Sequence, residues 1–148
     1  WPDGIWQLYR VTPKNGSYAP GEATFTKLTT FTDGLAGYTL SPDGKRVILL
    51  HASGGNENTQ LSLLDPLAPA GTAPTPILAN PKVQAAVTTW LPDSSGFIYS
   101  ANDTSPSDFH LYRYDFASSK ATKILAKEGS WSAADMAART GPDFPNAT

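Results

Sequence analysis

The two histidines of this 148-residue chain are its first candidates for chemistry, because a neutral imidazole can act as a general base or bind a metal ion. His51 lies inside a predicted strand, and His110 lies in a strand of the next predicted hairpin. Neither has the serine and the acidic residue that a hydrolytic triad places around its histidine. We therefore expect structural or surface roles for both, and we predict no catalytic residue.

A serine nucleophile of the α/β-hydrolase type lies in a Gly-x-Ser-x-Gly pentapeptide, followed in the chain by an acid and a histidine. The nearest approach is Gly-Ser-Trp-Ser-Ala at residues 129–133, which lacks the second glycine. The sequence thus has no nucleophile elbow, and we predict that this chain is not itself an enzyme.

Metal and phosphate chemistry also lack their usual residue patterns. With no cysteine and no His-Glu-x-x-His segment, a zinc site would need both histidines and a stray carboxylate. Residues 102–108 are rich in oxygen donors but lack the ligand spacing and the glycine of a calcium loop. The sequence has no Walker-type or dinucleotide-binding glycine loop. We predict no metal site and no cofactor.

Composition limits the class of protein. An apolar content of 40% and a charged content of 16% are typical of soluble globular domains. The net charge of −2 is too small to predict a nucleic-acid or membrane partner, and no apolar run approaches the ~20 residues that span a bilayer. The absence of cysteine leaves the compartment undetermined. Because Trp1 stands directly before a turn and a strand, we expect the sequence to be an excerpt.

The stretch 40–50, Leu-Ser-Pro-Asp-Gly-Lys-Arg-Val-Ile-Leu-Leu, organises the elements around these residues. Pro42 sets φ for the first corner of a turn, Asp43 can bond its own backbone, and Gly44 tolerates a positive φ. Residues 47–50 are apolar without alternation, so we expect a strand whose two faces are both covered.

The same plan returns 50 residues later, in Trp-Leu-Pro-Asp-Ser-Ser-Gly-Phe-Ile-Tyr at residues 90–99. Without a gap, the identical pairs are Ala36–Ala86, Thr39–Thr89, Pro42–Pro92, Asp43–Asp93, Ile48–Ile98, Leu61–Leu111 and Asp65–Asp115. A repeat of ~40–50 residues built from short strands is typical of a propeller blade.

Further strands and loops are predicted around the two copies. The expected strands are residues 5–11, 24–29, 35–40, 59–65, 77–78, 109–115 and 124–125. The expected loops are residues 13–22, 53–58, 67–76 and 103–108. Beyond Gly129, residues 131–132 could open another inner strand, residues 132–139 could instead form a short helix, and residues 141–148 form a frayed tail.

The fold predicted from this pattern is all-β, a partial β-propeller of about three blades, each a four-stranded antiparallel sheet. The expected units are a partial blade at 4–34, a blade at 35–84, a blade at 85–128 and the start of a next blade or a tail at 129–148. A closed propeller needs roughly four to eight blades. The chain is therefore a piece of a longer protein, or self-associates through open blade edges, or exposes apolar faces.

Aromatic residues could also line a groove for peptide or sugar, although packing between blades explains most of them. The residues concerned are Trp1, Trp6, Trp90, Trp131, Tyr9, Tyr38, Tyr99, Tyr112 and Tyr114.

Three stretches, 41–47, 90–100 and the Leu-Tyr-Arg-Tyr-Asp strand at 111–115, resemble blades of the propeller domain in the prolyl oligopeptidase family of serine peptidases. The likeness covers about residues 4–131. It implies a non-catalytic segment that gates or positions peptide substrates for a C-terminal α/β-hydrolase domain, which would hold the triad and is absent here. The paired glutamates of the family's dipeptidyl members have no Glu-Glu counterpart in this sequence.

TolB-type propellers use nearly the same Ser-Pro-Asp-Gly turn and strand, so the alternative is a scaffold that binds a protein partner. A Gly-x-Ser-x-Gly some hundreds of residues downstream would favour the peptidase, and a stop codon would favour the scaffold. A third possibility, a propeller enzyme with a metal in its channel, needs more inward histidines than this chain has.

Overall fold

The structure is a computed structural model that describes residues 4–52, 54 and 56–125. These residues form ten strands and no helix, which confirms the all-β prediction. The first sheet contains β1 (Tyr9–Pro13) and β2 (Ala23–Lys27). The second contains β3 (Leu35–Leu40), β4 (Val47–His51), β5 (Gln60–Leu64) and β6 (Thr75–Leu78). The third contains β7 (Ala85–Trp90), β8 (Gly96–Ser105), β9 (Asp108–Asp115) and β10 (Lys120–Leu125).

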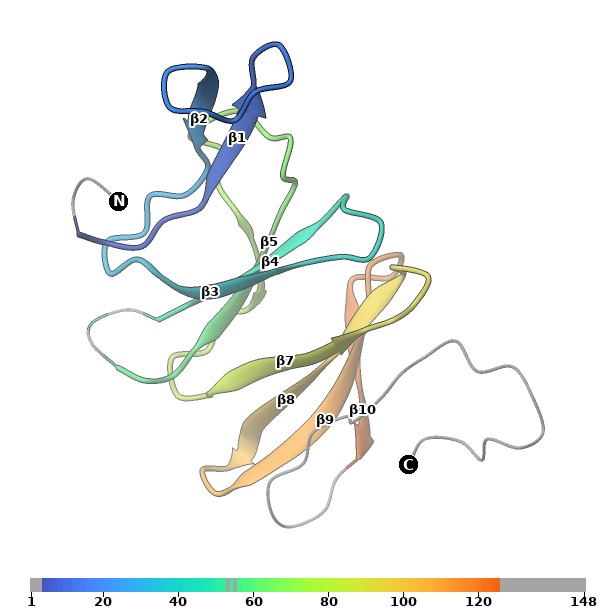
Figure 1. Ribbon diagram of the computed structural model, residues 1–148. Coiled ribbons are helices and arrows are strands. Elements are labelled where there is room, and N and C mark those ends of the chain that lie inside the picture. Colours follow the sequence, from blue (N-terminus) through green and yellow to red (C-terminus); the bar gives the residue numbers. More distant parts are fainter. Residues whose placement is uncertain (1–3, 53, 55, 126–148) are drawn as a thin grey trace.

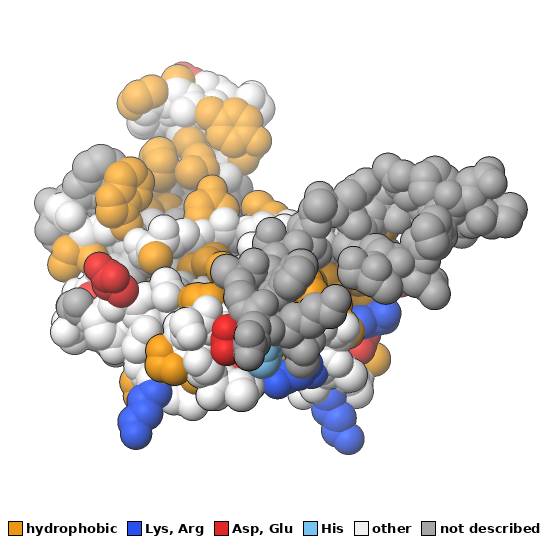
Figure 2. Space-filling view, turned by 90° about the horizontal axis from the view of Figure 1, so that it is seen from below, with side chains coloured by type: hydrophobic (Ala, Val, Ile, Leu, Met, Phe, Trp, Pro, Cys, Tyr) orange, Lys and Arg blue, Asp and Glu red, His pale blue; other side chains and the backbone are white. Residues whose placement is uncertain are grey.

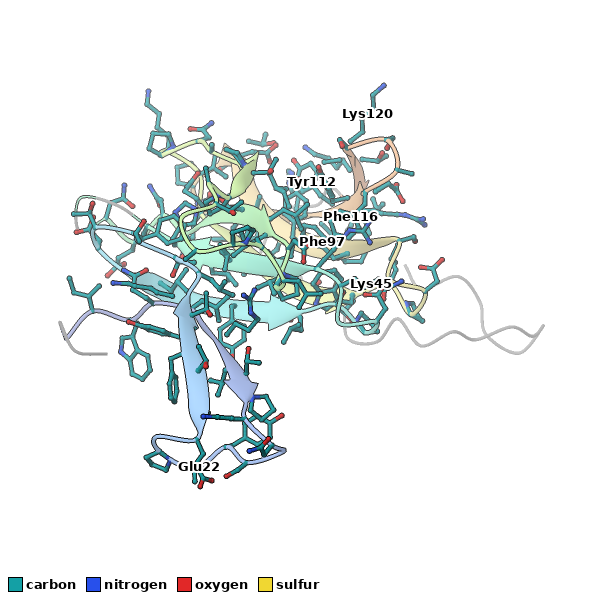
Figure 3. All side chains as sticks on the ribbon, turned by 90° about the horizontal axis from the view of Figure 1, so that it is seen from above. Glu22, Lys45, Phe97, Tyr112, Phe116 and Lys120 are labelled. Atoms are coloured by element: carbon teal, nitrogen blue, oxygen red, sulfur yellow. The ribbon has the colours of Figure 1, made fainter. Side chains whose placement is uncertain are left out.

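The three sheets follow one another in sequence order and lie side by side, as in successive blades of a propeller (Figure 1). In both four-stranded sheets the strands pair antiparallel in the order of the chain, so β3 and β7 lie at one edge and β6 and β10 at the other. The β1–β2 hairpin projects away from the two sheets, with Glu22 near its tip (Figure 3). The architecture is that of a partial β-propeller.

The repeated turn forms as the sequence predicts, because its aspartate accepts hydrogen bonds from other residues of the same turn. Asp43 Oδ1 accepts hydrogen bonds from the Ser41 hydroxyl at 2.6 Å and the Lys45 N–H at 3.0 Å. In the second copy, Asp93 Oδ1 accepts from the hydroxyl of Ser95 at 2.6 Å and from its N–H at 3.0 Å. These bonds, led by the one from the serine hydroxyl, hold the pKa of each aspartate below its usual value.

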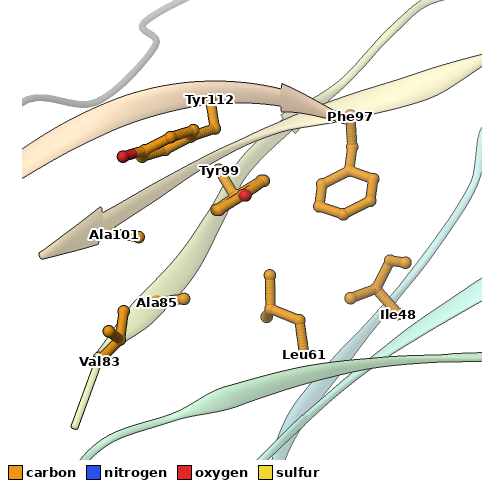
Figure 4. Packing of buried hydrophobic residues seen from close by; sticks show 8 residues of the cluster. All are labelled: Ile48, Leu61, Val83, Ala85, Phe97, Tyr99, Ala101 and Tyr112. Carbon is orange, nitrogen blue, oxygen red and sulfur yellow. The ribbon is translucent and has the colours of Figure 1, made fainter. Parts of the chain in front are cut away.

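Both apolar strands are buried on both faces and lie in different sheets, as the sequence analysis requires. One face of β4 and β5 packs against β8 and β9 to form the central core (Figure 4). Its buried members are Ile48, Leu61, Val83, Ala85, Phe97, Tyr99, Ala101 and Tyr112. The opposite face of β4 packs toward the β1–β2 hairpin through Val47, Leu49, Leu64, Ala68 and Leu28.

Phe97 is the centre of the core and is fully buried. Its ring lies 5.4–5.9 Å, between centroids, from four other aromatic rings, those of Trp90, Tyr99, Tyr114 and Phe116. The core that holds these rings also contains residues of the second sheet, so packing between blades explains this group, as predicted. Trp6 and Tyr38 are exceptions, because their side chains are 61% and 55% exposed. Trp1 and Trp131 lie outside the described residues.

The first predicted strand is displaced. The sequence predicts residues 5–11, whereas β1 spans Tyr9–Pro13. The reason is Gln7, whose side chain replaces ladder bonds: Oε1 accepts from Phe31 N–H at 3.1 Å and Nε2 donates to Phe31 O at 2.6 Å. The second strand correspondingly ends at Lys27 rather than at residue 29, because the Thr29 hydroxyl bonds Gln7 and Leu8 instead.

Two predicted loops are shorter than expected. Residues 75 and 76, assigned to the loop 67–76, belong to β6, where Pro76 is tolerated because β6 is an edge strand that need not donate outward. Most of the predicted loop 103–108 is also strand, since β8 extends to Ser105 and β9 begins at Asp108. The first sheet has two strands, in the region predicted as a partial blade at 4–34. The predicted alternatives for residues 129–148 lie outside the described residues.

We expect Phe97→Ala to lower the free energy of unfolding by about 3–5 kcal/mol, because it leaves a cavity among four rings. Phe25→Ala is the matched control, since Phe25 is 60% exposed and its loss should cost within about 0.5 kcal/mol. Urea denaturation followed by circular dichroism measures both. Equal losses would contradict a core built between the sheets.

Candidate functional site

Both histidines occupy packed positions. The His51 ring stacks on Phe31, with centroids 4.3 Å apart and planes 18° apart, and its Nε2 lies 2.8 Å from Ser62 Oγ. Burial lowers the pKa of His51, which favours the neutral ring. His110 is buried in β9, with Nδ1 3.5 Å from Thr104 Oγ1. No group of three or more potential metal ligands gathers among the residues that the structure describes.

A tyrosine–aspartate pair occupies the hairpin that was predicted as an oxygen-rich loop. The Tyr112 hydroxyl donates a hydrogen bond to Asp103, and burial together with this bond raises the Tyr112 pKa. Burial, with a smaller effect from the Asp103 charge, raises the pKa of Tyr99 to about 12. Both phenols therefore remain protonated at neutral pH, so the pair joins β8 to β9 as a hydrogen bond and provides no nucleophile.

A candidate binding site is a groove of about 560 Å³ between the edge strands β3 and β7. Its volume is in the range of ligand-binding clefts. It is lined by Gly37, Tyr38, Thr39, Pro42, Leu50, Val87, Thr88, Thr89 and Trp90. None of these side chains is charged, and three are threonines, so the groove suits an uncharged ligand.

Specific contacts set the geometry of this groove. Trp90 Nε1–H donates to Thr39 Oγ1 across the two sheets at 2.9 Å. Each edge strand has a register irregularity at the groove, between Leu35 and Gly37 in β3 and between Val87 and Thr89 in β7. Bulges of this kind bend a strand and interrupt regular pairing. The irregularities thus shape the facing strand edges.

A second set of contacts fixes the ends of the two sheets beside the groove. The Asp43 N–H donates to the hydroxyl of Ser94 at 3.0 Å, which joins one repeated turn to the next. Ser94 is buried and has φ 61°, in the place that Gly44 takes in the first copy with φ 70°. Arg46 adds a cation–π contact, 4.3 Å from the centre of the Phe116 ring.

The sequence analysis named the two aromatic residues of the groove only within a larger set for which packing was the favoured explanation. Trp90 and Tyr38 belong to that set, and both line the groove. Thr39 was noted as an identical position of the repeat and Thr88 was not noted, because no binding motif marks either residue. Gly37 provided a usable signal, since a glycine inside a strand pattern often marks a bulge.

Comparisons with solved structures agree with this architecture. TolB from Acinetobacter baumannii has a TM-score of 0.55 and 22% identity, over 77% of this chain and 26% of that one. A protein from Agrobacterium tumefaciens provisionally named TolB has a TM-score of 0.52 and 18% identity, over 81% of this chain and 47% of that one. The chain has a TolB-like propeller fold.

At these identities the likeness concerns the fold alone. The chain spans about a quarter and about half of the length of the two TolB chains. No family model and no curated protein matches the sequence. Within the described part of the chain, no helix is present that could cross a membrane.

The cross-sheet bond at Ser94 gives a paired prediction. Ser94→Ala loses the bond from the Asp43 N–H and keeps a side chain at positive φ, so we expect a loss of about 1 kcal/mol in the free energy of unfolding. Ser94→Gly loses the same bond but relieves the left-handed backbone, so it should be about 1 kcal/mol more stable than Ser94→Ala. Urea titration of both variants tests this. Equal stability would show that the backbone conformation carries no strain.

The lowered pKa of His51 predicts a pH dependence. In the unfolded chain this histidine takes up a proton near its ordinary value of 6.5, whereas the folded chain resists protonation to a lower pH. Stability is therefore fully present above pH 6.5 and falls as the pH drops toward the folded pKa. Urea denaturation between pH 7.5 and 5 should show this decrease, and His51→Gln should make it shallower. An unchanged slope in the variant would contradict this origin.

Proposed function

We propose that this chain is a non-catalytic, TolB-like propeller segment that binds a protein partner, and that the groove between β3 and β7 takes an extended, uncharged segment of that partner. The observation that carries the proposal is the pairing of an uncharged cleft with two strand edges that border it.

An extended peptide can use both features at once. Backbone groups at the open edges of β3 and β7 supply directional hydrogen bonds to the backbone of an added strand. The side chains of Leu50, Val87 and Trp90 supply apolar contact, and the threonine hydroxyls accept or donate further bonds. Recognition of this kind selects shape and backbone extension rather than charge.

The chain itself has no part in bond cleavage under this proposal. Its described histidines are held by stacking, burial and hydroxyl contacts, at His51 by Phe31 and Ser62. A role in gating substrates for the hydrolase domain of a serine peptidase, with peptide as substrate, stays a prediction of the prolyl oligopeptidase resemblance. The fold likeness to TolB supports the scaffold better.

Gly37→Ile tests the groove. A Cβ added at Gly37 would meet no atom within 4 Å, and this glycine does not need a positive φ, so the larger side chain can occupy the groove without backbone strain. Replacing a strand glycine should also raise the free energy of unfolding, by about 0.5–1 kcal/mol. We therefore expect weaker peptide binding together with greater stability.

Ala36→Ile is the matched control, because it adds a comparable side chain at the neighbouring residue, which does not line the groove. Binders would be selected from a displayed library of unstructured peptides on the native chain and measured on both variants by fluorescence anisotropy. Affinity should fall at least about tenfold for Gly37→Ile and little for Ala36→Ile. Failure to select any binder, or equal binding by all three chains, would refute the proposal.

A further inference from the structure

The β1–β2 hairpin repeats the cross-strand register of β9–β10. The equivalent pairs are Tyr9–Lys27 with Tyr112–Lys123, and Arg10–Thr26 with Arg113–Thr122. The next position along also agrees, since the Leu28 N–H donates to Leu8 O at 2.8 Å where Leu125 pairs with Leu111. β1 and β2 are therefore the structural counterparts of the third and fourth strands of a blade.

The two hairpins differ in what lies on their inner side. β9 pairs with β10 on one edge and with β8 on the other, whereas β1 pairs only with β2 within the described residues. Bonds at Leu8 and Lys14 fix which residues of β1 face β2. Because antiparallel pairing alternates, the N–H and C=O groups of Tyr9 and Val11 point away from β2. This outward row is an open strand edge.

A hollow of about 330 Å³ lies beside that edge, between the hairpin and β3. Among its lining residues, Leu40 and Leu67 are 48% and 78% exposed. At the equivalent place in the next sheet, 50 residues after Leu40, the indole of Trp90 packs on Phe97 and bonds β3. β3 therefore presents an uncovered apolar face where β7 has a neighbouring sheet.

The hollow is almost free of charged side chains. Its one charged lining residue is Arg10, whose Nη1–H groups donate to Pro66 O at 3.0 Å and Ala68 O at 2.9 Å. Separate hydrophobic areas with few charged side chains among them also appear on the face shown in Figure 2. The strand edge and the hollow therefore offer backbone hydrogen bonds and apolar contact to a ligand.

We propose that the β1 edge and this hollow together form a docking seat for a two-stranded antiparallel hairpin of the β3–β4 pattern, supplied by polypeptide outside the described residues. Its outer strand pairs with β1 as β8 pairs with β9, and its inner strand covers Leu40 and Tyr38. In the second sheet, the β4 residues that pair with the corresponding positions of β5 are Leu49 and Val47. In the third sheet, the corresponding residues of β8 are also apolar or aromatic. We therefore expect apolar residues in the docked strand opposite Tyr9 and Val11.

A second copy of the chain fits this seat less well. Symmetric pairing of β1 with its copy would extend the sheet, but it would leave the hollow empty. A hairpin satisfies both the edge and the hollow.

The probe is a synthetic peptide of residues 35–51, added to the full 148-residue chain. We expect saturable binding by isothermal titration calorimetry, with backbone amide exchange slowed at least about tenfold at Tyr9 and Val11. Val11→Pro removes one outward N–H without touching a bond to β2, so it should weaken binding about fivefold or more relative to Val11→Ala, which keeps the N–H. Leu40→Ser, on β3, should also weaken binding and leaves β1 unchanged.

Gly37→Ile, the variant that fills the groove between β3 and β7, distinguishes the two proposed sites. It should bind the 35–51 peptide with the same affinity as the native chain, because its added side chain does not lie in the docking seat. Equal affinity of Val11→Pro and Val11→Ala would overturn the proposal, as would protection at β6 or β10 in place of β1. Protection of Tyr9 and Val11 without peptide, in a concentration-dependent dimer, would assign the edge to a second copy and overturn the hairpin as occupant.

Discussion

Burial of one sheet's face against the next is the interaction on which this structure depends. A four-stranded sheet of this length cannot cover its own apolar faces, and isolated two-stranded hairpins are marginal in water. The face of β4 and β5 that carries Ile48 and Leu61 is covered only because Phe97 and Tyr99 project from β8 toward it. Each sheet therefore depends on its neighbour to bury its apolar face. Two of the residues repeated in the sequence, Ile48 and Leu61, form this contact between sheets.

The bond between the two repeated turns and the groove are consequences of that packing. Once the sheets are face to face, the two turns meet, and the Ser94 hydroxyl can take the Asp43 N–H. The edge strands β3 and β7 meet along one side, where Trp90 reaches Thr39. The irregular register of both edge strands shapes the groove that lies between them.

Local chemistry made part of this fold predictable. Pro42, Asp43 and Gly44 specify a turn by their own backbone preferences, and the unbroken apolar run at 47–50 specifies a strand covered on both faces. The β1 boundary was not predictable, because it depends on the Gln7 side chain bonding Phe31, 24 residues away. The groove likewise depends on the register between strands, which no single segment encodes. The sequence pointed to aromatic residues, and only the packed sheets show which of them are exposed.

The strand edges differ in how they are protected against added strands. The outer edges carry known deterrents: Pro76 in β6, and Lys120, Lys123 and a register shift in β10. The inner strands β3 and β7 contain neither lysine nor proline. β1 ends in Pro13, and its only cation, Arg10, is bonded to loop carbonyls instead of protecting the strand edge. Pairing at the outer rim is thus disfavoured, and among the described residues the edges with fewest deterrents are those of β3, β7 and the Tyr9–Val11 part of β1.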